Sequence, residues 1–157
     1  AIKATPMEAI RNLKEADMEA MGFQLRFENR WARVVYHPGL KVVLCQLLSD
    51  YVPIEHFRSM FQQISALIES GDFTKFIFDK RSLRTFHQPS MEWYFLYWKQ
   101  EMMRYGLLQH RKILPNLNWF KTAVAIEREK IASKMSPEAV KKLDIRYCDN
   151  IQEAIQL

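Results

Sequence analysis

Asp79 and His87 are the two side chains whose types and spacing could support acid–base chemistry. A carboxylate and an imidazole can share proton transfer when a fold brings them within hydrogen-bond reach. Covalent catalysis would also need a nucleophile placed in a recognisable order with that pair, and the sequence offers none. We therefore interpret His87 as a loop residue and predict that the chain has no catalytic residues.

Metal and nucleotide chemistry find no matching pattern either. The four histidines and two cysteines show no HxH, CxxC or HExxH spacing, so we expect no metal site. Four glycines are too few to suggest a phosphate-cradling loop, and we expect no cofactor. Cys45 and Cys148 lie far apart in apolar or strand-like contexts, which indicates buried free thiols in a reducing compartment.

A group of basic residues follows the apolar segment that ends in Asp79, and a second group opens a later strand. Guanidinium and ammonium groups near a helix start could hold a phosphate or carboxylate. In the alternative, Arg81 or Arg84 forms an ion pair with Asp79 or Glu92 and only fixes the loop. The candidate anion-binding residues are Lys80, Arg81, Arg84, Arg111 and Lys112.

The net charge of +5 is unevenly distributed along the chain. Residues 75–142 hold 14 Lys or Arg against 6 Asp or Glu, a local charge of +8, and the other residues sum to −3. This excess favours an anionic ligand or an acidic partner, or else forms a solvated lysine-rich face. The basic residues are spread over several elements without a recognised module, which argues against nucleic acid.

A helix predicted from Ser90 to about Gly106 is aromatic almost all round in its first half. A surface helix normally shows one apolar stripe, so something should cover the outer side. Packing against the core of the same chain accounts for half of the aromatic surface. For the other half we favour a homodimer interface, with an apolar ligand pocket as the alternative. The candidate interface or ligand residues are Trp93, Tyr94, Tyr97 and Trp98.

The remaining elements follow from hydrophobic periodicity and from turn residues. Residues 1–22 form an amphipathic helix that extends the domain at its N-terminus, and residues 23–157 form one domain with no apolar run long enough to span a membrane. Strands are predicted from 23, over 31–37, 41–48, 74–79, 111–114 and 145–147, with helices over 53–71, 90–106 and 117–134, from 136 and from 150. The fold class is therefore α/β: a single-domain mixed β-sheet with N-terminal antiparallel hairpin strands, then strand–helix alternation, flanked by helices.

Three segments in this order resemble the SpoIIAA-like branch of the STAS superfamily, which is related in shape to CRAL-TRIO lipid-binding domains. They are Phe76-Ile77-Phe78-Asp79, Arg111-Lys112-Ile113-Leu114-Pro115, and Ile145 to Ile155 with its acidic helix start. The resemblance implies a STAS-like fold and a regulatory role. Some relatives carry an Asp-Ser-Ser-Gly segment whose serine is a phosphorylation switch. That pattern is absent here, and Ser90, the nearest serine, is a candidate helix cap with phosphorylation as the alternative.

Together these observations predict a bacterial, cytoplasmic, non-enzymatic module that binds a protein partner or itself. The alternative is a carrier or sensor of a small apolar, lipid-like or anionic ligand.

Overall fold

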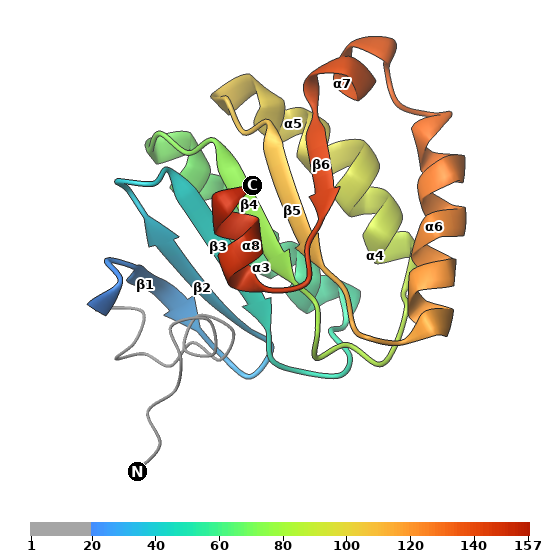
Figure 1. The fold of residues 1–157 in the computed structure, drawn as a ribbon, viewed down its shortest axis with the longest axis horizontal. Helices are drawn as coiled ribbons and strands as arrows, with labels where there is room; N and C mark the ends of the chain where they lie inside the picture. The colour runs from blue at the N-terminus through green and yellow to red at the C-terminus, as the bar shows by residue number, and fades with distance from the viewer. Residues whose placement is uncertain (1–19) are drawn as a thin grey trace.

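The computed structural model describes residues 20–157, shown in Figure 1. Residues 1–19, which hold most of the predicted N-terminal helix, lie outside the described residues. One six-stranded sheet runs through the described part in the order β1-β2-β3-β4-β5-β6. Its strands are β1 (Gln24–Glu28), β2 (Ala32–His37), β3 (Val42–Leu47), β4 (Lys75–Asp79), β5 (Gln109–Ile113) and β6 (Asp144–Tyr147).

The sheet is mixed, and its direction changes at β3. Strands β1, β2 and β3 pair antiparallel, whereas β3, β4, β5 and β6 pair parallel. Hairpin turns can join antiparallel neighbours, but each parallel neighbour needs a crossover, which helices supply here. The predicted α/β fold class, with hairpin strands first and strand–helix alternation afterwards, is confirmed.

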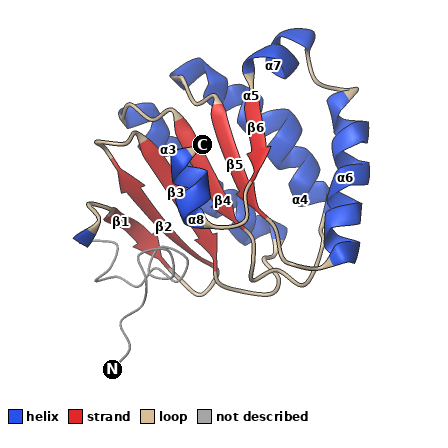
Figure 2. Ribbon diagram, viewed as in Figure 1, coloured by secondary structure: helices blue, strands red, loops and turns tan. Residues whose placement is uncertain are grey.

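Helices cover both faces of the sheet unequally, as Figures 1 and 2 show. The C-terminal helix α8 lies on the near face in these views, and the longer helices lie on the far face. The helical segments are α3 (Ile54–Ser70), α4 (Gln88–Glu92), the π-helix η1 (Trp93–Trp98), α5 (Lys99–Met102), the 3-10 helix η2 (Met103–Tyr105), α6 (Asn118–Ala132), α7 (Pro137–Lys142) and α8 (Ile151–Gln156). None of the helices in residues 20–157 is long and apolar enough to cross a membrane.

Helix α3 shows why the larger core lies on the far face. Pro53 precedes its first turn and Gly71 follows its last, as expected for a helix start and stop. Its buried residues, including Phe57, Phe61 and Ile64, recur at helical spacing and pack against Phe76 and Phe78 of β4. Helix α8 covers a smaller core on the other face, which holds Ile77, Ile113 and Ile151.

The aromatic helix lies in the middle of the far layer. It runs from α4 through η1 and α5 to η2, and ends at Gly106, whose φ of 86° is left-handed. Tyr94, Phe95 and Trp98 project from it into the core, and the Trp98 indole donates a 2.8 Å hydrogen bond to the Ser65 hydroxyl on α3. The cover predicted for the aromatic half is thus supplied largely by this chain's own helices and sheet.

Candidate functional site

Strand alternation sends the predicted basic residues of β5 to opposite faces of the sheet. Arg111 points toward α8, where it donates to the Asp144 carboxylate at 2.9 Å and to the carbonyl oxygens of Asp144 and Leu157, both at 2.8 Å. Lys112 points toward the aromatic helix, with its amine 3.3 Å from the centroid of the Phe95 ring. The structure therefore does not bring these two cations together at one anion site.

Arg81 forms the ion pair that the sequence left open as an alternative. Its Nη2 and Nε lie 2.7 and 2.9 Å from the two carboxylate oxygens of Asp79, and its backbone N–H also donates to that carboxylate. Arg84 donates to the carbonyl oxygens of Arg81 and Leu83. These bonds fix the loop after β4 at the carboxyl edge of the sheet.

A cationic groove lies beside that loop. It has a volume of about 860 Å³ and runs between the ends of the last three strands and α6. Four cations and one carboxylate line it. We define the cationic groove by all its lining residues: Arg81, Arg84, Leu114, Asn116, Lys121, Val124, Ala125, Arg128, Tyr147, Cys148 and Asp149.

Helix α6 supplies two cations of the cationic groove that were not among the predicted site residues. Lys121, Val124, Ala125 and Arg128 follow one another at positions i, i+3, i+4 and i+7, so they share one helix face. The Arg128 guanidinium lies 5.2 Å from the centroid of the Tyr147 ring, and the Lys121 amine lies 3.3 Å from Asn116 Oδ1. This spacing is a sequence signal that groups them on one helix face, but it does not place that face beside the loop after β4.

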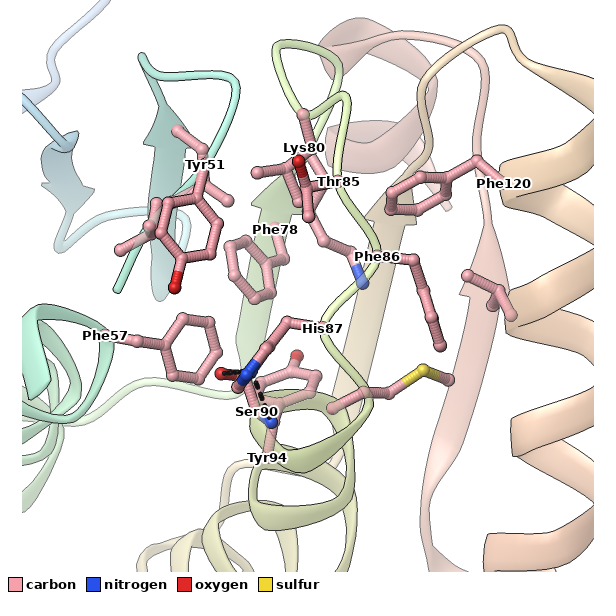
Figure 3. Close-up of a pocket in the computed structure, with 15 residues that line it drawn as sticks. Tyr51, Phe57, Phe78, Lys80, Thr85, Phe86, His87, Ser90, Tyr94 and Phe120 are labelled. Atoms are coloured by element: carbon pink, nitrogen blue, oxygen red, sulfur yellow. Dashed lines mark hydrogen bonds between the residues drawn. The ribbon is translucent and has the colours of Figure 1, made fainter. Parts of the chain in front are cut away.

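A second, smaller cavity lies behind the same loop and holds Lys80 (Figure 3). Its volume is about 60 Å³, and its walls are mostly apolar. Only 7% of Lys80 is exposed, and burial lowers the pKa of its amine to about 8. Figure 3 shows the amine pointing into the space among Phe78, Phe86 and Tyr94. We call this space the Lys80 cavity; it is lined by Leu47, Tyr51, Val52, Phe57, Phe78, Lys80, Leu83, Thr85, Phe86, His87, Ser90, Met91, Tyr94, Phe120 and Val124.

Further buried cations surround Tyr94. The amines of Lys99, Lys112 and Lys80 lie 4.8, 5.3 and 5.9 Å from the centroid of its ring. The Tyr94 hydroxyl has no hydrogen-bond partner among residues 20–157, and the amines of Lys99 and Lys112 have none other than each other. Burial holds the pKa of Lys99 and of Lys112 well below the ordinary value for lysine, and it raises that of Tyr94.

Ser90 is not the N-cap of its helix. The cap is His87, whose Nδ1 accepts from the Ser90 backbone N–H at 3.3 Å and lies 2.8 Å from the Ser90 hydroxyl. Ser90 lies in the first turn, is 7% exposed and lines the Lys80 cavity. The helix begins at Gln88, two residues before the predicted start, because Pro89 lies in its first turn and does not mark a boundary before it.

The four predicted aromatic interface residues are divided between core and surface. Tyr94 and Trp98 are only 1% and 2% exposed, so they stabilise the fold and present no surface. Tyr97 is 61% exposed and stacks on the partly buried Trp93, with ring centroids 5.9 Å apart. Trp93 and Tyr97 alone remain accessible to a partner.

Within the described part of the chain, no three His, Cys, Asp or Glu side chains lie close enough together to hold a metal ion. Comparison with known proteins finds no match to the chain among protein-family models, curated proteins or solved structures.

Proposed function

We propose that the protein is a non-enzymatic module that carries or senses an organic anion bound in the cationic groove. The observation that carries this proposal is the lining of the groove, where Arg84, Lys121 and Arg128 face a single carboxylate, beside Arg81, which is already paired with Asp79. Carboxylate and phosphate groups are the ligands that arginine and lysine bind best.

The size and position of the cationic groove support the same conclusion. A volume of about 860 Å³ suits a ligand larger than a single inorganic ion. The groove lies at the carboxyl ends of parallel strands, where open α/β sheets commonly bind ligands. Leu114, Val124 and Ala125 add an apolar wall, so the ligand would combine an anionic group with an apolar or aromatic body.

Isothermal titration calorimetry with sodium pyrophosphate as the probe tests this proposal. Removing one groove charge, as in Lys121→Gln or Arg128→Gln, should weaken binding about threefold to tenfold, because each exposed charge contributes modestly. Raising the salt concentration should weaken binding of the wild type as well, since the groove is open to solvent.

Lys130→Gln is the matched control. Lys130 lies on the same helix and does not line the groove. Its substitution by Gln changes the net charge by the same amount as Lys121→Gln. Equal weakening by Lys130→Gln and Lys121→Gln would mean that only the overall charge of the protein matters, and would overturn the groove as the site.

A protein partner, or a second copy of the chain, remains the second candidate function. The stacked pair Trp93 and Tyr97 favours it, because exposed aromatic rings are typical of interfaces. The resemblance to SpoIIAA-like domains would place such a module in a regulatory role in the bacterial cytoplasm, and the two free buried thiols agree with a reducing compartment. A homodimer that Tyr97→Glu splits, measured by native mass spectrometry, would support this candidate.

A further inference from the structure

We propose that Lys80 captures a small apolar aldehyde as a reversible imine inside the Lys80 cavity. This proposal does not depend on the cationic groove, because Lys80 does not line that groove. It adds a covalent ligand site to the molecule.

The fold directs the Lys80 amine into the Lys80 cavity. Lys80 directly follows β4, and its backbone N–H is held by the Ile113 carbonyl oxygen at 2.8 Å. Its side chain turns into the far layer, where the amine lies 5.1 Å from the centroid of the Phe78 ring. Its contacts within residues 20–157 are with aromatic rings, those of Phe78 and Tyr94, and not with a carboxylate.

Burial also changes the protonation state of the Lys80 amine. Only a neutral amine attacks a carbonyl carbon, and an apolar environment disfavours the ammonium form. With a pKa of about 8, about one Lys80 in ten is neutral at pH 7. A lysine with the ordinary pKa of 10.5 is almost entirely protonated at pH 7, so Lys80 has a much larger neutral fraction.

Tyr94 supplies a hydrogen-bond donor. It lines the same cavity, is almost fully buried, and its hydroxyl has no partner in the described part of the chain. A hydroxyl donor of this kind can hydrogen-bond the carbonyl oxygen and stabilise the charge that develops on it. Tyr94 is therefore a positioning residue for the aldehyde.

The reaction needs no oxidant or reductant. The lone pair of Lys80 Nζ forms a bond to the carbonyl carbon, and a proton moves from nitrogen to oxygen to give a carbinolamine. Loss of water then forms the C=N bond, so that amine and aldehyde yield imine and water. Hydrolysis by the reverse path releases the aldehyde.

Cavity volume sets the size of the aldehyde. A volume of about 60 Å³ leaves room only for a small molecule. An alkyl group in the cavity would contact the rings of Phe57, Phe86 and Phe120. The ligand class is therefore an aliphatic aldehyde of very few carbon atoms, and an aromatic aldehyde should not fit.

Reductive trapping tests the proposal. The full chain is incubated at pH 7 with acetaldehyde and sodium cyanoborohydride, and modified lysines are quantified by peptide mapping. We expect Lys80 to be ethylated at least tenfold faster than the exposed Lys130 and Lys141. With 4-methylbenzaldehyde as the probe, this preference for Lys80 should disappear.

Several lysines of the same molecule serve as controls. Lys99 and Lys112 also have lowered pKa values, but they are fully buried and do not line the Lys80 cavity, so they should stay unmodified. Tyr94→Phe should slow modification of Lys80 severalfold while leaving Lys130 unchanged. In the wild-type protein, modification of Lys80 at the rate of Lys130, or preferential modification of Lys99, would overturn the proposal.

Discussion

Lys99 and Lys112 are fully buried and have no carboxylate within ion-pair distance among residues 20–157. Burying an ammonium group without a counter-ion is costly, so a folded lysine in this position gives up its proton more readily. Aromatic faces reduce the cost, since the amines lie 3.7 and 3.3 Å from the Phe95 ring centroid. These two residues therefore make stability depend on pH.

The direction of that dependence follows from proton binding. The unfolded chain keeps the Lys112 proton up to its ordinary pKa of 10.5, whereas the folded chain releases it at lower pH. Between the two pKa values unfolding takes up a proton, so this contribution to the free energy of unfolding rises with pH. Lys112→Met should therefore stabilise the protein by about 1–4 kcal/mol at pH 7, and the gain should shrink as the pH approaches 10.5.

Urea denaturation of Lys112→Met and wild type at pH 7 and pH 10 measures this difference. Lys130→Met is the exposed control and should change the free energy of unfolding by less than about 0.5 kcal/mol. A Lys112→Met variant less stable than wild type at pH 7 would show instead that the ammonium stabilises the fold through its ring contacts.

Asp79 is the other buried residue with a specific structural role. Its carboxylate accepts from the Arg81 backbone and guanidinium and lies 3.5 Å from the Gln46 amide nitrogen. Asp79→Asn should lower the free energy of unfolding by about 1–3 kcal/mol, because charge-assisted bonds in a buried site are lost. Glu138→Gln breaks the exposed pair with Lys142 and should leave the midpoint of thermal denaturation almost unchanged, whereas Asp79→Asn should lower it clearly. Equal effects would contradict the buried ion pair.

At the scale of elements, the π-helix η1 determines which aromatic rings are inside. A π turn changes the helical spacing locally, and here it places Tyr94, Phe95 and Trp98 in the core while Tyr97 faces solvent. Trp98→Ala should therefore lower stability by about 3–5 kcal/mol, and Tyr97→Ala by less than about 1 kcal/mol. Chemical denaturation measures both. A large loss with Tyr97→Ala would mean that its ring is covered by a partner.

Most strands and helices could be predicted because the spacing of their apolar residues indicates the type of element. Segments such as β3 and α3 bury nearly every residue that the pattern marks as apolar. The burial of strand β5 could not be predicted in this way, because polar residues such as His110, Arg111 and Lys112 are usually exposed. Their burial depends on neighbouring strands and on the Phe95 ring, Asp144 and Leu157, which are distant in the chain.

In the candidate site, too, residues indicated by the local sequence could be predicted, and residues brought together by the fold could not. Arg81 and Arg84 were found because they directly follow β4, and both line the cationic groove. Arg111 and Lys112 were grouped with them by sequence position, but pleating separates their side chains. Lys121 and Arg128 join the groove only because α6 folds back over the carboxyl ends of the strands, which no local pattern specifies.

At the scale of the whole molecule, the basic residues between 75 and 142 are divided among three environments. Lys80, Lys99 and Lys112 are buried around Tyr94, where their lowered pKa values reduce the charge that they carry. Others line the cationic groove, where they can meet a ligand. The rest of the charge is on exposed helix faces such as those of Lys130 and Lys142.

The most direct test of the account is an amide-resolved NMR titration with sodium pyrophosphate at constant ionic strength. Binding in the cationic groove predicts saturable shifts over residues 81–84, 114–128 and 147–149, with β1 and β2 unchanged. Shifts that never saturate, or that appear equally at exposed cations such as Arg26 of β1, would contradict a built anion site.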